Sequence, residues 1–241
     1  MIGINFLGKG TDSGTVYTRP LSANDVAGVL GHMQANWNNA EGADNTTGLG
    51  LHDADGQATG ATVTWTFGGK SYTAVSDSTG DGCLMRGYLY RFSTLAPPSI
   101  TVADLGPSFT AHGYDVLVYF DGQNATGSPS DWITQHTLTA GGSTFGTVFG
   151  KDAAGVNFGG TFAEASGTAA ANATAGNYVR FRGLTASGFT LTATPVSGDG
   201  PINAIQIIGA PEPASASLLA LGLASAFAAR VRRRALRRRD A

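Results

Sequence analysis

Apolar and polar residues alternate along the body of the chain in short segments that are separated by glycine-rich turns. The clearest segment is 61–67, ATVTWTF, in which Val63, Trp65 and Phe67 share one face and threonines occupy the other. A period of two is typical of a β-strand with one buried face. Segment 114–120, YDVLVYF, is apolar on both faces apart from one aspartate, which predicts a central strand that is covered on both sides.

Further short segments of this character predict the remaining strands, at 2–7, 72–75, 84–92, 99–103, 132–139, 144–149, 156–162, 178–182, 188–194 and 202–208. Frequent turn signals without any βαβ alternation predict an all-β fold over residues 1–209, an antiparallel β-sandwich of jelly-roll-like architecture. The one helical candidate in this body is 22–35. Gly28 and Gly31 oppose a helix there, so we expect a single turn or an ordered loop.

The end of the chain has a different pattern. Pro211-Glu212-Pro213 precedes an uncharged run rich in alanine and leucine, 214–229, and seven arginines follow: Arg230, Arg232, Arg233, Arg234, Arg237, Arg238 and Arg239. The run predicts a helix of about 24 Å, shorter than the roughly 30 Å hydrocarbon core of a bilayer. Arginine stems can lengthen such a span, and their charge favours a cytoplasmic C-terminus. The alternative interpretation of the run is a short buried core helix.

The order Pro-Glu-Pro, apolar helix, arginine cluster and chain end resembles the PEP-CTERM sorting signal of Gram-negative bacteria, over Pro211 to Ala241. The resemblance implies a precursor in the inner membrane whose N-terminus is outside, with 214–229 as its transmembrane helix. An exosortase, which is a membrane thiol protease, would cleave near Pro-Glu-Pro and release residues 1–209 to the cell surface or extracellular matrix. The signal occurs in bacteria that make exopolysaccharide, which makes such a polymer a candidate partner.

Scattered pieces of the body, which together span most of residues 2–209, are also similar to exported PEP-CTERM proteins of verrucomicrobial and planctomycetal type. They are INFLG, NWNN, ATVTW, LMRGYLY, YDVLVYF, NYVRF, GFTLTATP and INAIQII. This resemblance implies a secreted β-domain and no catalytic residue. The opening MIGINFLG fits a first strand and lacks the basic and apolar regions of a signal peptide, so we expect the natural start to lie upstream.

The net charge of −2 combines an acidic body with a basic tail. Residues 1–213 carry eight of the fifteen basic and sixteen of the seventeen acidic side chains, a net charge of −8. Residues 214–241 carry the seven arginines and Asp240, a net charge of +6. An acidic body argues against nucleic acid as a partner, and a basic cluster joined to an apolar helix suits a membrane surface better than nucleic acid.

The body offers little that is suited to catalysis. It has no G-x-S-x-G motif and no P-loop. Asp115 is the best single candidate for a glycosidase carboxylate, although a second carboxylate would have to lie roughly 5–10 Å away; a hydrogen-bonded structural aspartate is the alternative. Cys83 is the only cysteine and is expected to be a small buried hydrophobe. The four histidines lack the spacing of a zinc site: His32, His52, His112 and His136.

Two segments combine a tryptophan with amide or carboxylate groups, as glycan-binding loops do. They are Asn36-Trp37-Asn38-Asn39 and Asp131-Trp132. The alternative is a tryptophan in the core whose asparagine neighbours make local hydrogen bonds. Asp53 and Asp55, in DADGQ, resemble half of a calcium loop but lack its closing glutamate, so a plain Asp-Gly turn is the alternative there.

These patterns leave three functions open. The first is an exported, non-enzymatic surface or matrix protein that binds extracellular polysaccharide through loop aromatics. The second is a purely structural matrix protein, and the third is a carbohydrate-active enzyme. We expect the first, with no cofactor beyond a structural calcium ion.

Overall fold

The computed structural model describes residues 1–8, 18–42, 44–66, 69–73, 75–91, 96–124 and 130–211, and only the backbone of 69–72. Contacts divide the chain after Gly209. The predicted span 214–229, the seven arginines and most of the Pro-Glu-Pro motif lie outside the described residues. Within the described ranges, no helix is both long and apolar enough to cross a membrane.

Strands predominate in the part of the chain that the structure describes, so the predicted all-β class is confirmed. One sheet has the order β12 (Tyr178–Leu184), β8 (Tyr114–Tyr119), β14 (Ala204–Gly209), β1 (Ile2–Phe6) and β2 (Asn38–Ala40). The other has the order β11 (Thr174–Ala175), β10 (Ser143–Asp152), β9 (Trp132–Ala140), β13 (Phe189–Pro195), β7 (Ser99–Ala103), β4 (Ala58–Thr66) and β3 (Asn45–His52). A third, two-stranded sheet consists of β5 (Gly69–Tyr72) and β6 (Gly87–Tyr90).

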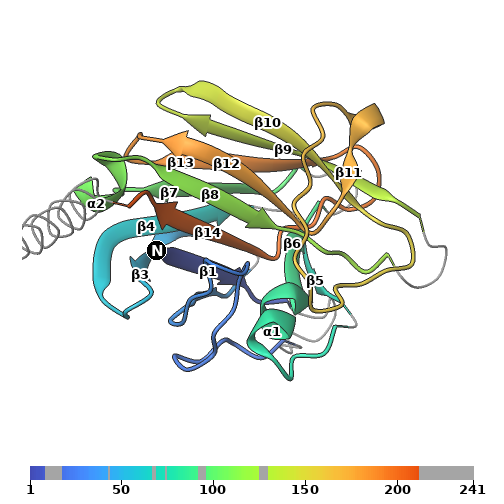
Figure 1. Ribbon diagram of the computed structural model, residues 1–241, viewed down its shortest axis with the longest axis horizontal. Helices are drawn as coiled ribbons and strands as arrows, with labels where there is room; N and C mark the ends of the chain where they lie inside the picture. The colour runs from blue at the N-terminus through green and yellow to red at the C-terminus, as the bar shows by residue number, and fades with distance from the viewer. Residues whose placement is uncertain are drawn as a thin grey trace, which may run out of the picture. The chain divides into compact units, whose positions relative to one another are not determined.

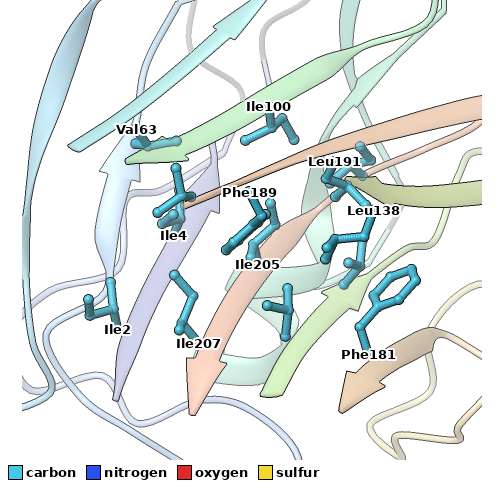
Figure 2. Packing of buried hydrophobic residues seen from close by; sticks show 14 of the residues in the cluster. Ile2, Ile4, Val63, Ile100, Leu138, Phe181, Phe189, Leu191, Ile205 and Ile207 are labelled. Atoms are coloured by element: carbon cyan, nitrogen blue, oxygen red, sulfur yellow. The ribbon is translucent and has the colours of Figure 1, made fainter. Parts of the chain in front are cut away.

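The two large sheets pack as a β-sandwich (Figure 1). Neighbouring strands are antiparallel except in the pairs β1–β2 and β10–β11, which are parallel. Figure 2 shows the apolar side chains of both inner faces pointing into the space between the sheets. Val63 and Trp65 lie in this core, as the alternation predicts, whereas Phe67 lies outside the described residues.

The five-stranded sheet is covered on its second face as well. Leu117 and Tyr119 of β8 lie in a separate apolar cluster with Trp37 from the loop before β2 and with Leu84 and Met85 of α1 (Gly80–Arg86). Val116 and Val118 point into the main core. The prediction of a strand covered on both faces is therefore confirmed for β8.

The helix α1 replaces the first part of a predicted strand. Thr79 caps it by accepting a hydrogen bond from Gly82 N at 3.0 Å, which is a favourable helix start. Glycine is required at both Gly80 and Gly82, because a Cβ atom would lie 2.2 Å from Val26 O and 2.0 Å from Ser76 O. Within the strand predicted for 84–92, Gly87–Tyr90 is a strand, and Phe92 lies outside the described residues.

Other differences from the sequence expectation concern segments with weak patterns. β3 has no counterpart among the predicted strands, because glycines and threonines interrupt any alternation in it. Segment 156–162 was expected to be a strand, but it is irregular. The segment 22–35 is an ordered loop as expected, held by reciprocal main-chain hydrogen bonds of 3.0 Å between Ala27 and Gln34. Two further short helices are α2 (Pro107–Thr110) and η1 (Ala170–Asn172).

One polar side chain lies in the core without a partner. His136 of β9 is 0% exposed, and neither ring nitrogen has a hydrogen-bond partner among the described residues. Its ring lies against Phe120, with 5.1 Å between the ring centroids. Burial lowers the pKa of His136 from 6.5 to about 3, because a charged imidazole would lose its hydration there.

His136 should therefore make folding sensitive to acid. Below pH 6.5 the His136 imidazole binds a proton in the unfolded chain but not in the folded chain. Each pH unit below that value therefore lowers the free energy of unfolding by about 1.4 kcal/mol. When the pH falls from 7.5 to 4.0, the free energy of unfolding of wild type should decrease by about 3 kcal/mol more than that of the variant His136→Leu. Urea unfolding at both pH values measures this. His112→Leu, at an exposed loop position, is the control. An equal pH-dependent difference from wild type in that variant would contradict the assignment of the effect to the buried His136.

Candidate functional site

An open cleft of about 370 Å³ lies where the end of β8 approaches the end of β10. Asp121 follows β8, and Asp152 is the last residue of β10, so the cleft joins the two sheets. The connection from β10 towards β11, including Asn157 and Phe158, forms another part of its wall. The end of β10 pairs with β11, which is labelled in Figure 1.

The two carboxylates of the cleft are buried, at 3% and 4% exposure. Asp121 Oδ2 accepts a hydrogen bond from Phe158 N at 3.2 Å, and Asp152 Oδ2 accepts one from Gly122 N at 2.8 Å. Burial raises the pKa of Asp121 to about 8, and the nearby Asp152 carboxylate adds to that rise. Burial also raises the pKa of Asp152 to about 7. Among the described residues neither carboxylate forms an ion pair.

Asparagine side chains hold the segments around the cleft. Asn203 donates to Met85 O at 2.9 Å and accepts from Asp121 N at 2.6 Å, which positions the start of the loop after β8. Asn177 bridges the opposite wall by donating to Thr161 O and accepting from Ala163 N, each at 2.9 Å. The walls are thus fixed by side-chain contacts to the main chain.

The first predicted glycan-binding segment lies elsewhere and has a different role. Trp37 is 4% exposed, packs edge-on against Tyr119 and donates from Nε1 to Gln34 O at 3.1 Å. Gly3 lies directly against its ring, because a Cβ atom there would be 2.5 Å from Trp37 Cε3. The ring therefore offers no face for stacking on a sugar. Trp37 is a core residue, which was the alternative interpretation of this segment.

The asparagines beside Trp37 hold the main chain together. Asn38 donates to Gly3 O and His52 O, each at 2.9 Å, and accepts from His52 N at 2.9 Å. Asn39 exchanges two hydrogen bonds with the main chain of Leu21, and Asn36 donates to Ala54 O at 2.8 Å. Their amide groups are thus engaged within the protein.

The second predicted segment, Asp131-Trp132, lies at the start of β9. The Trp132 ring is partly buried and packs against two glycines, since Cβ atoms at Gly122 and Gly198 would lie 2.4 Å and 2.1 Å from it. Asp131 is exposed and pairs with Lys151 at 3.2 Å. Trp132 thus supports the loops beside the cleft, and little of its ring is free for a ligand.

The calcium candidate Asp53 belongs to the hairpin turn between β3 and β4. Its Oδ1 accepts hydrogen bonds from Asp55 N at 3.0 Å and Gln57 N at 2.9 Å, as in an ordinary Asp-Gly turn. Asp55 is exposed. Within the described ranges, no three or more histidine, cysteine, aspartate or glutamate side chains group in a way that would hold a metal.

The remaining sequence candidates have structural contacts. Asp115 pairs with Arg180 at 2.6 Å and accepts from Gly183 N at 2.9 Å, beside the irregular end of β12. This is the structural alternative proposed for it. Cys83 is buried as expected, and burial raises the pKa of its thiol to about 11.

The outer side of the seven-stranded sheet carries regular rows of hydroxyl groups, which we call the threonine face. The strand register aligns one row across β9, β13, β7 and β4 and a second across β10, β9, β13, β7 and β4. The rows are Thr139, Thr190, Thr101 and Thr64, and Thr147, Thr137, Thr192, Ser99 and Thr66. None of these side chains is charged, and most are partly exposed.

The hydroxyl groups of this face already contact one another. Thr101 Oγ1 and Thr190 Oγ1 lie 3.0 Å apart, and Thr137 Oγ1 and Thr147 Oγ1 lie 3.3 Å apart. An open hollow of about 410 Å³ is lined by Thr101, Thr139 and Thr190 and by the turn after β9. Adjacent rows should be spaced by about 6.6–6.8 Å along each strand, and neighbouring strands by about 4.7–4.9 Å.

No family model, curated protein or solved structure matches this chain. The threonine face was visible in the sequence only as the polar half of alternating strands, because its rows depend on the strand register. The pairing of Asp121 with Asp152 has no short-range signal, since 31 positions separate them and the pair forms only when the two sheets pack.

Proposed function

We propose that this chain is the precursor of an exported, non-enzymatic surface or matrix protein with a jelly-roll-like β-sandwich that binds extracellular polysaccharide. The C-terminal signal would place the precursor in the inner membrane, and an exosortase would then release the β-sandwich to the cell surface or matrix. The single observation that carries the binding proposal is the threonine face, an uncharged array of hydroxyl groups in register across five strands.

The threonine face suits a neutral, repeating polymer. Each threonine hydroxyl can donate one hydrogen bond and accept two, so it matches sugar hydroxyls in either direction. One such contact in water is weak, about 0.5–1.5 kcal/mol net. Many contacts along one chain add up, because each contact that forms holds the next sugar close to the protein. The absence of charge predicts binding that changes little with salt.

The buried carboxylates do not favour the enzymatic alternative. A glycosidase acid must contact the glycosidic oxygen, and its partner must reach the sugar ring or a water beside it. Asp121 and Asp152 are almost fully buried, and main-chain amides already occupy one oxygen of each. A polymer would have to displace the walls of the cleft to reach both.

Removing two hydroxyls from the middle of the threonine face tests the binding proposal. The double variant Thr101→Val/Thr190→Val keeps shape and β-propensity but loses the central hydroxyl pair. We expect at least a threefold loss of retention on insoluble neutral polysaccharide in co-sedimentation, with an unchanged melting temperature. Thr185→Val, at an exposed position outside the face, should retain wild-type binding.

The same measurement separates the alternatives. If wild-type protein is retained on no polysaccharide, the purely structural alternative replaces this proposal. If the double variant is retained as well as wild type, polysaccharide binds at another surface. If the polysaccharide is shortened during incubation, the enzymatic alternative holds.

A further inference from the structure

Two unpartnered amide oxygens accompany the two buried carboxylates of the cleft. Asn124 is 2% exposed, and its Oδ1 has no hydrogen-bond partner among the described residues. Asn157 lines the cleft, and its Oδ1 is also buried without a partner in the described part of the chain. Buried acceptors of this kind are uncommon, because each costs about 1–3 kcal/mol when it is left unpaired.

The orientation of the Asn124 amide is determined by its surroundings. Its Nδ2 donates to Asp152 O and Ala153 O at 3.1 Å each, and to Ser130 O at 3.4 Å. Three carbonyl oxygens around one atom identify that atom as the nitrogen, because an oxygen there would be repelled. The unpartnered oxygen therefore belongs to an amide that is held against the residues of the cleft.

Asp121, Asp152 and Asn157 line one cleft, and Asn124 is held against Asp152 through its amide nitrogen. Among the described residues no cation pairs with either carboxylate. Asp121 and Asp152 are acidic, and the cation nearest in sequence, Lys151, pairs with Asp131 instead. Two carboxylates in a shared buried site repel each other unless a proton or a cation lies between them. A proton would relieve the repulsion between the carboxylates, but its single O–H could satisfy at most one of the two amide oxygens.

We propose that Asp121, Asp152, Asn124 and Asn157 bind a calcium ion. Calcium takes six to eight oxygen ligands from carboxylates, asparagine side chains, main-chain carbonyls and water. Zinc favours nitrogen and sulfur ligands, and none of the four side chains supplies them. Magnesium demands a nearly ideal octahedral geometry and keeps several waters, which suits an open surface site better than these buried side chains.

A calcium ion here would join three segments that are far apart in the sequence. It would tie the loop after β8 to the last residue of β10 and to the connection that leads to β11. It would place calcium in the cleft and not at the hairpin candidate Asp53. The inference does not rest on the proposed function, because the cleft is distinct from the threonine face.

The stability of the full chain with and without calcium tests the inference. After treatment with EDTA and dialysis, we expect CaCl₂ at 100 times the dissociation constant to raise the melting temperature by about 5–10 °C. The same concentration of MgCl₂ should raise it by less than a third as much. Isothermal titration calorimetry should show one calcium ion bound per chain.

Variants of the carboxylates distinguish a calcium site from a general salt effect. Asp121→Asn and Asp152→Asn remove a buried negative charge while they preserve shape, so in EDTA each should be at least as stable as wild type. In calcium each should lose the thermal shift and the calorimetric binding. Asp55→Asn, in the hairpin, should retain both and so serves as the matched control.

Three results would overturn the inference. The first is a wild-type protein with no calcium-dependent shift and no measurable binding, which would assign the pair to a shared proton. The second is an equal shift in wild type and in Asp121→Asn/Asp152→Asn. The third is a shift that is lost in Asp55→Asn and retained in Asp152→Asn, which would return the site to the hairpin.

Discussion

Replacing Trp37 by alanine is expected to lower the free energy of unfolding by about 3–5 kcal/mol, the usual cost of truncating a large buried aromatic side chain. The side chain fills the space between Gly3 and Tyr119 on the outer face of the five-stranded sheet. Its removal leaves a cavity that the surrounding loop cannot close easily, since Asn38 and Asn39 hold that loop to other segments. Equilibrium unfolding in urea measures the loss.

The variant Trp37→Phe separates packing from ligand binding. It retains an aromatic ring but loses part of the volume and the hydrogen bond to Gln34 O, so it should cost less than half as much as alanine. Gly3→Ala should also destabilise the protein, because it presses a methyl group into the same ring. Polysaccharide retention should be unchanged in Trp37→Phe. A folded Trp37→Phe protein that no longer binds would restore Trp37 as a ligand contact.

The alternation of apolar residues was sufficient to predict much of the fold. Val63 and Trp65 alternate with threonines and lie in the core, and the doubly apolar segment around Leu117 is covered on both faces. The helix α1 could not be predicted in this way. Its apolar residues also suit a strand, and the helix depends on the close approach of Gly80 and Gly82 to other segments.

The candidate sites were harder to predict, because their chemistry depends on distant contacts. An asparagine-flanked tryptophan is equally consistent with an exposed loop and with a core plug, and only the position of Gly3 against Trp37 decides between them. Asp121 begins an Asp-Gly pair that indicates a turn, and the residues around it do not predict that Asp152 lies close to it in the fold. Sequence patterns therefore predicted individual strands, whereas the cleft required knowledge of how the sheets pack.

The chemistry of the C-terminal segment favours a temporary membrane anchor. Four leucines and Phe227 should favour insertion by about 0.3–0.6 kcal/mol each, roughly 1.5–3 kcal/mol together. Three serines and Gly222 oppose it. Such a segment would be a weak permanent anchor, but under the sorting proposal it would suffice for a precursor that a protease shortens soon after export. The arginines that follow add attraction to anionic lipids of about 1 kcal/mol each near the surface.

Replacing Pro211-Glu212-Pro213 by three alanines is therefore expected to change the fate of the whole chain. In a host with an exosortase, and with an export signal fused before Met1, wild-type protein should be released with a new C-terminus near Pro211. The variant should remain in the membrane fraction at full length, because the protease no longer recognises it while the apolar run and arginines still hold it. Mass spectrometry of both fractions measures this.

A matched substitution in the body shows whether that effect belongs to the motif. Glu41→Ala changes an exposed glutamate of the β-sandwich and should be released like wild type. A host without an exosortase should retain wild-type protein at full length, which separates specific cleavage from general proteolysis. Release of the triple-alanine variant with the wild-type C-terminus would contradict the sorting proposal. That result would not test the proposals for the threonine face and the cleft, because both lie within Met1–Gly209.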